Sequence, residues 1–104
     1  MFDKTILVIG TYDTKDDELN YLCDRIRAQG GGVLTMDVSV LGDPSVPTDI
    51  SKHDIAKTGG SSIEAAIASE DENIAMQIMA NGAAAKALEL YLAGRIHGAI
   101  ILGG

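Results

Sequence analysis

The residues best suited to chemistry lie in a polar loop that follows the first predicted strand. This loop reads GTYDTK, and its candidate ligand-binding residues are Gly10, Thr11, Asp13, Thr14 and Lys15. Hydroxyl groups, a lysine and the free N–H groups at the start of the next helix attract anions. The combination predicts a phosphate-binding loop, although it is neither a Walker A motif, because GK[ST] is absent, nor a GxGxxG turn.

A second interpretation of this loop requires no ligand. Asp13, Asp16, Asp17 and Glu18 would repel a phosphate unless a cation intervened. Acidic residues also favour the positive end of a helix dipole, so an ordinary strand-to-helix turn would have the same composition. Residue types and spacing alone leave both interpretations open.

Two further loops follow predicted strands and are expected beside the first. Asp37 and Ser39 end the second strand, where nucleotide-binding folds often place an acid on the ribose hydroxyls. The alternative for Asp37 is a carboxylate that caps its own loop. Gly103 and Gly104 begin the third loop. Because ligands of open parallel sheets bind beyond the carboxyl ends of the strands, the three loops predict one crevice.

The other reactive side chains are interpreted as structural: His53 and His97 at element ends, and Cys23, Met76 and Met79 in the core. The GGSS segment at residues 59–62 could receive an anion, but a helix end followed by an N-cap explains it better. No GxSxG or HExxH motif occurs, so the sequence specifies no catalytic group and no metal site. An enzyme acting on a small phosphorylated or carboxylated metabolite stays open, with Asp13 and Lys15 as its local candidates.

Hydrophobic patterning predicts the elements that position these loops. Apolar runs typical of buried parallel strands span residues 5–9, 33–38 and 97–102. Helical patterns lie between them, at residues 15–29, 51–59, 61–67 and 71–93. This order predicts an α/β fold, a three-layer open parallel sheet of Rossmann or flavodoxin-like type with strand order 2-1-3. Such a sheet does not normally finish on its third strand, so residues 1–104 are interpreted as one domain, the truncated front part of a larger one.

Local signals predict how the helices begin and which side they bury. Capping boxes are expected where a hydroxyl residue precedes an acidic residue by three positions, at Thr14, Ser51 and Ser61. The apolar markers of the last helix are Ile74, Ile78, Leu88 and Leu92, and Gly82 is expected to bend it.

Composition excludes several classes of function. The 104 residues include 8 Lys and Arg against 15 Asp and Glu, a formal charge of -7. This balance opposes general nucleic-acid binding and attachment to an anionic membrane surface. A single cysteine provides no disulfide framework, and no apolar run approaches the ~18 residues of a membrane span. The N-terminus lacks a signal peptide, so we expect a cytoplasmic protein.

The third predicted strand has implications for partners. An apolar strand at a sheet edge needs a neighbour, so we expect a homo-oligomer or contact with a carboxyl-terminal domain of the same protein. A non-catalytic dimerisation or docking module, acting through the sheet and the helix at residues 71–93, is therefore the alternative to ligand binding.

Four segments together resemble a known family. They are TILVIGTYDTKDDELNYLCDRI, VLTMDVSVLGDP, TGGSSIE and NGAAAKALELYLAGRIHGAIILGG. Over almost the entire chain they resemble the amino-terminal domain of the Tm-one-like ATP-binding family. The resemblance implies that ATP, with Mg²⁺ as an optional companion, binds at the crevice. It matches the GTYDTK residues to the first family loop, Asp37 and Ser39 to the second, and Gly103 and Gly104 to the third. Asp16 departs from the glycine usual there.

Overall fold

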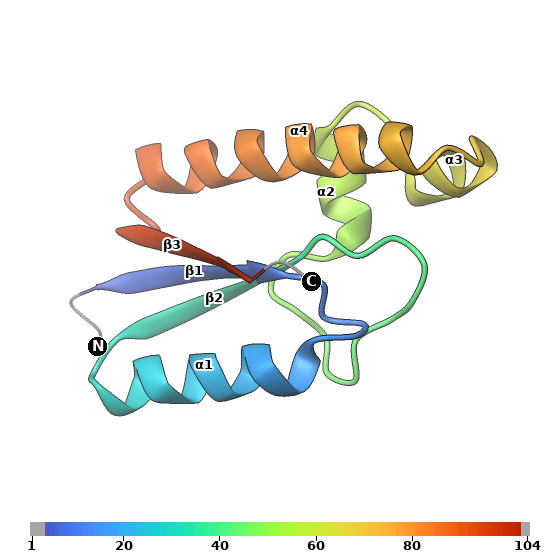
Figure 1. Ribbon diagram of the computed structural model, residues 1–104. Helices are drawn as coiled ribbons and strands as arrows, with labels where there is room; N and C mark the ends of the chain where they lie inside the picture. Colours follow the sequence, from blue (N-terminus) through green and yellow to red (C-terminus); the bar gives the residue numbers. More distant parts are fainter. Residues whose placement is uncertain (1–3, 103–104) are drawn as a thin grey trace.

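Three parallel strands form the centre of the computed structural model, which describes residues 4–102 (Figure 1). β1 (Thr5–Gly10) lies between β2 (Gly32–Asp37) and β3 (Gly98–Leu102), so the strand order is β2-β1-β3. From Ile6 to Gly10, each β1 residue lies opposite one residue on either side, as Val8 lies opposite Thr35 and Ile100. The predicted α/β fold class and strand order are confirmed.

Helices cover both faces of this sheet. α1 (Asp16–Ala28) lies on one face, whereas α2 (Lys52–Thr58) and α4 (Glu72–Leu92) lie on the other (Figure 1). The short α3 (Ile63–Ala68) packs against α4 and α2. The layers are therefore helix, sheet and helix, as the sequence predicts. Within residues 4–102 no helix is both long and apolar enough to cross a membrane.

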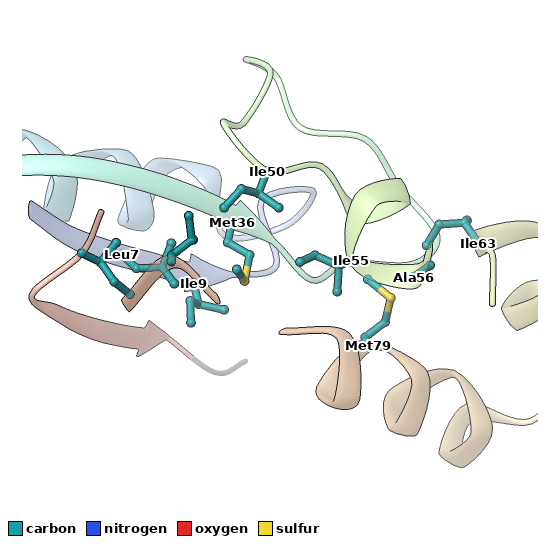
Figure 2. Close-up of a cluster of buried hydrophobic side chains, with 10 residues drawn as sticks. Leu7, Ile9, Met36, Ile50, Ile55, Ala56, Ile63 and Met79 are labelled. Carbon is teal, nitrogen blue, oxygen red and sulfur yellow. The ribbon is translucent and has the colours of Figure 1, made fainter. Parts of the chain in front are cut away.

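The sheet divides the buried side chains into two clusters, because successive strand residues point to opposite faces. Leu7 and Ile9 belong to the cluster on the α2–α4 side, which also contains Met36, Ile55 and Met79 (Figure 2). On the α1 side the buried cluster contains Val8, Tyr12, Leu19 and Cys23. The core positions expected for Cys23 and Met79 are confirmed.

Of the three predicted capping boxes, one is confirmed and two are wrong. Ser51 forms the expected capping box with Asp54. α1 instead begins after Lys15 with no side-chain cap, because Thr14 belongs to a turn in which Thr14 and Lys15 both donate to the Thr11 carbonyl. α3 is capped by Ser62, one residue later than predicted, since the preceding chain turns through Gly60 at a φ of 84°.

α4 buries a different side from the one that its large apolar residues suggest. Its buried residues are Ala75, Met79, Gly82 and Leu90, whereas Ile74, Leu88 and Leu92 are exposed. Gly82 does not interrupt the helix; a Cβ there would collide with the Ile55 carbonyl oxygen. The glycine thus permits the close crossing of α4 over α2, and small residues decide which side is buried.

Candidate functional site

A cavity of about 720 Å³ lies beside the carboxyl ends of β1 and β2, and we call it the strand-end crevice. Its polar wall comes from the β1–α1 loop and from Ser39, which follows β2. Its other walls come from residues 38–41 and from the start of α4 with the end of α3. Four of the predicted site residues line it together with Ser39: Thr11, Asp13, Thr14 and Lys15.

The β1–α1 loop presents free polar groups to the strand-end crevice. The Thr11 carbonyl accepts hydrogen bonds from the N–H groups of Thr14 and Lys15, at 3.2 and 2.8 Å, which fixes the loop through its backbone. The Thr11 and Thr14 hydroxyl oxygens lie 3.4 Å apart on the same wall. Among residues 4–102, Lys15 has no salt-bridge partner. The N-cap residue of α1 makes no side-chain cap, but Asp17 donates its N–H to the Asp16 carboxylate at 3.0 Å, and the acidic side chains of the first turn offset the positive end of the helix.

Ser39 is the most unusual polar residue of the strand-end crevice. Its side chain is only 3% exposed, yet its hydroxyl oxygen has no hydrogen-bond partner among the described residues. Its backbone N–H is satisfied by the Asp37 carboxylate at 2.9 Å. A buried hydroxyl without a partner costs about 1–3 kcal/mol, so this group is a candidate contact for a bound molecule.

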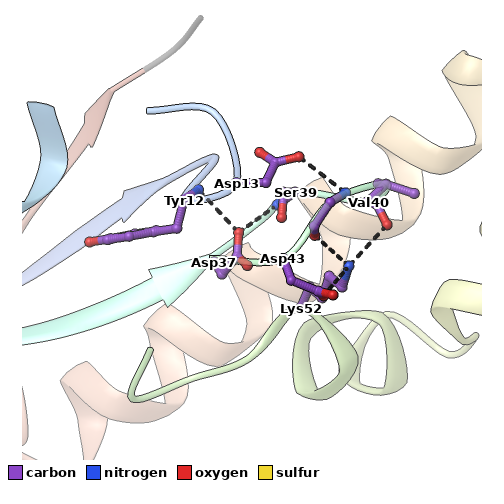
Figure 3. A network of polar contacts seen from close by, with 8 residues as sticks. Tyr12, Asp13, Asp37, Ser39, Val40, Asp43 and Lys52 are labelled. Atoms are coloured by element: carbon purple, nitrogen blue, oxygen red, sulfur yellow. Dashed lines mark hydrogen bonds and ion pairs between the residues drawn. The ribbon is translucent and has the colours of Figure 1, made fainter. Parts of the chain in front are cut away.

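Asp37 links the first two loops. It is 1% exposed, and one carboxylate oxygen accepts hydrogen bonds from the N–H groups of Tyr12 and Ser39, at 3.3 and 2.9 Å (Figure 3). It lines a smaller cavity of about 240 Å³, separate from the strand-end crevice. This geometry corresponds to the loop-capping alternative, and the predicted contact with a ribose has no support from the position of the carboxylate.

The second loop is held by a lysine that the sequence analysis missed. Lys52 is buried and donates to the carbonyls of Val40 and Gly42, at 3.3 and 2.6 Å, while pairing with Asp43 at 3.1 Å (Figure 3). Asp13 holds the same loop from the other side by accepting the Gly42 N–H at 3.2 Å. A lysine in the first turn of a short helix carries no local signal for this role, because its partners lie 9 to 12 residues earlier.

Glycine and the buried reactive groups near β1 have structural roles. A Cβ on Gly10 would lie 2.7 Å from the Leu19 side chain, so this glycine permits α1 to pack against the end of β1. Burial raises the pKa of both Tyr12 and Cys23 above their ordinary values, which keeps both groups protonated and unsuited to act as nucleophiles. Gly103 and Gly104 lie outside the described residues.

Opposite the polar wall, the strand-end crevice is apolar with an acidic rim. Val40, Ile67 and Met76 contribute apolar surface. Met76 is 62% exposed, so its predicted place in the core is wrong. Glu70 and Glu72 supply negative charge on this side, beside Asp71, which caps α4. In residues 4–102, no three His, Cys, Asp or Glu side chains are grouped to hold a metal ion.

Comparison with known families identifies the domain. A family model described as "Uncharacterised protein family (UPF0261) N-terminal domain" matches residues 4–104. The chain belongs to the UPF0261 family. UPF0261 proteins from Brucella suis and Clostridium tetani are 48% and 38% identical to it, over 95% and 98% of this chain. The aligned segment is 24% and 25% of those relatives, so the chain spans about a quarter of their length. No solved structure matches the chain.

These matches correct the family expected from the sequence motifs. The resemblance to the Tm-one-like ATP-binding family is wrong, because the family model and the curated relatives both indicate UPF0261. The UPF0261 matches also give no support to a description of this domain as ATP-binding. The interpretation of the chain as the front part of a larger protein agrees with the lengths of the relatives. Assignment of ligand-binding residues therefore rests on the geometry of the strand-end crevice.

Proposed function

We propose that this amino-terminal domain binds a small phosphorylated molecule in the strand-end crevice. The observation that carries the proposal is Ser39: the residue lines the crevice, and its buried hydroxyl has no partner in residues 4–102. The hydroxyl oxygen itself is closed off from the crevice, so the Ser39 side chain would have to rotate before it could donate a hydrogen bond to a phosphate oxygen; that bond would offset the cost of burying the hydroxyl.

The donors of the polar wall are the groups that would hold an anion, and Asp13 on the same wall opposes them with one negative charge. Lys15, which immediately precedes α1, provides a positive charge at the crevice and has no salt-bridge partner among residues 4–102. The hydroxyls of Thr11 and Thr14 add two further donors. Together these groups suit one phosphate with three acceptor oxygens.

The size and far wall of the crevice favour an organic phosphate. About 720 Å³ lies within the usual range for small-molecule sites and exceeds what inorganic phosphate fills. Val40, Ile67 and Met76 would contact the organic part. Glu70 and Glu72 would repel additional phosphates, so a nucleoside monophosphate fits better than a polyphosphate unless Mg²⁺ accompanies the latter. ATP enters only as one member of the class to be tested.

Calorimetric titration of the full-length protein with inorganic phosphate, AMP and ATP, each with and without Mg²⁺, tests this proposal. We expect saturable binding of at least one organic phosphate, weakened about tenfold by Lys15→Ala, a loss of about 1.4 kcal/mol. Lys57→Ala is the matched control, since Lys57 is exposed on α2 and lies outside the crevice, and it should leave affinity unchanged. Absence of saturable binding to all three ligands would overturn the proposal.

A further inference from the structure

The two outer strands of the sheet differ in whether their outer edges are hydrogen-bonded. The edge of β2 is closed by the chain that precedes α2. Ile50 donates its N–H to the Thr35 carbonyl at 2.9 Å and accepts the Asp37 N–H at 3.0 Å. Asp49 accepts the Thr35 N–H on its carboxylate at 2.8 Å. The outward-facing backbone groups of β2 are therefore occupied over the second half of the strand.

The edge of β3 has no such closure among residues 4–102. β3 pairs with β1 alone and is the last strand of the sheet order. Natural edge strands avoid unwanted pairing through lysine, proline, a bulge or a covering loop. The sequence of β3 is GAIIL, which contains no charged residue and no proline. Its free edge therefore has the composition of an interior strand.

Exposed apolar side chains on both faces of β3 extend this contrast. Ile101 lies opposite Ile9 and shares its face on the α2–α4 side, where it is 71% exposed. Ile100 lies opposite Val8 on the α1 side and is 39% exposed. Strands with apolar residues on both faces are normally covered by helices above and below. The neighbour of β3 must therefore supply cover on two faces as well as along the edge.

We propose that the polypeptide following residue 104 in the full-length protein supplies a fourth strand, which pairs with the free edge of β3. The UPF0261 relatives are about four times as long as the aligned segment, which is more than enough polypeptide to form an additional strand. A strand and its crossover helix from the same polypeptide would cover the edge and one face, and further chain from the same polypeptide would cover the other face. A second copy of this domain is the competing occupant, and the test separates the two.

Hydrogen–deuterium exchange of the full-length protein examines the edge directly. Along an open edge strand only every second amide is hydrogen-bonded, so exchange across residues 98–102 should alternate between fast and slow. Pairing with a fourth strand makes all of these amides slow, with the otherwise exposed ones slowed on the order of 100-fold. We expect uniform protection that persists on dilution. An alternating pattern would overturn the proposal, and protection lost on dilution would overturn it in favour of a second copy.

A substitution at Ile101 tests independently whether the α2–α4 face of β3 is covered in the full-length protein. At a side chain 71% exposed, Ile101→Lys should hardly change stability if β3 stays uncovered. If the following chain covers it, the melting temperature of the full-length protein should fall by roughly 6–12 °C. Tyr21→Lys is the matched control, because Tyr21 is 68% exposed on α1, and it should leave the melting temperature unchanged. Equal effects of the two substitutions would contradict the proposal, and the exchange measurement on the unaltered protein does not depend on either variant folding.

Discussion

The two loops that form the strand-end crevice differ in what their polar side chains do. In the β1–α1 loop, backbone bonds to the Thr11 carbonyl and one bond from the Tyr12 N–H to Asp37 fix the chain, while the Lys15 side chain and the paired Thr11 and Thr14 hydroxyls line the crevice. In the loop at residues 38–43, polar side chains from elsewhere hold the backbone. Asp37 and Lys52 supply most of those contacts. One loop is therefore built to present functional groups, and the other is built to keep its shape.

Because of this difference, a substitution in one group of residues should change stability, and a substitution in the other group should change ligand affinity. Substitutions in the groups that hold the loops should lower the free energy of unfolding. Substitutions in the groups that face the strand-end crevice should leave stability unchanged and alter ligand affinity. Polar residues with the same chemical character, such as Lys15 and Lys52, thus fall into different classes because of where their partners lie.

The largest expected effect is at Asp37. Asp37→Ala removes the acceptor for the N–H groups of Tyr12 and Ser39, and leaves two buried donors unsatisfied. We expect the free energy of unfolding to fall by about 3 kcal/mol, measured by urea denaturation. Asp37→Asn keeps one acceptor oxygen and should cost about 1 kcal/mol. A loss of ligand affinity in Asp37→Asn with unchanged stability would instead assign Asp37 to the crevice.

Tyr12 should show a smaller effect that depends on pH. Its hydroxyl donates to the Val8 carbonyl at 3.0 Å, so Tyr12→Phe should cost about 1 kcal/mol at neutral pH. Burial raises the pKa of Tyr12 above its ordinary value of 10.0, so the folded state binds this proton more tightly than the unfolded state. Stability is therefore fully present below pH 10 and falls as the pH rises further.

Urea denaturation at pH 7 and above pH 10 measures this dependence. Cys23 contributes in the same direction above its ordinary pKa of 9.0, because burial also raises its pKa. Tyr12→Phe should weaken the loss of stability at high pH without abolishing it. An identical loss in the variant would mean that the Tyr12 phenol titrates as it does in the unfolded chain.

The fold could be predicted because its signals are local. Continuous apolar strands and helical spacing determined the element order, and the strand order followed from general rules for parallel sheets. The buried side of α4 could not be predicted, because Gly82 is buried through its close approach to α2, which hydrophobic spacing does not reveal.

In the candidate site, too, some features could be predicted from the sequence and others could not. Sequence motifs located the β1–α1 loop and Ser39 correctly beside one another, because carboxyl ends of neighbouring parallel strands must meet. They could not show that Asp37 is occupied by backbone N–H groups, or that Lys52 reaches back to Gly42. Such contacts depend on the path of an irregular loop, and a single residue type does not encode that path.

The smallest effect on stability, and the sharpest distinction between the two loops, is expected at Ser39. Ser39→Ala removes a buried hydroxyl that has no partner in residues 4–102, so the free energy of unfolding should stay the same or rise by up to about 1 kcal/mol. Affinity for the organic phosphate should fall about fivefold to tenfold, because the hydrogen bond to the ligand is lost.

Ser62→Ala provides the matched control for this prediction. The Ser62 hydroxyl accepts the Ala65 N–H as the N-cap of α3, so its removal should cost about 1 kcal/mol and leave affinity unchanged. The same chemical change should therefore produce opposite results at the two serines. If Ser39→Ala instead destabilises the unbound protein as Ser62→Ala does, its hydroxyl has an internal partner, and the argument for a ligand at this position is lost.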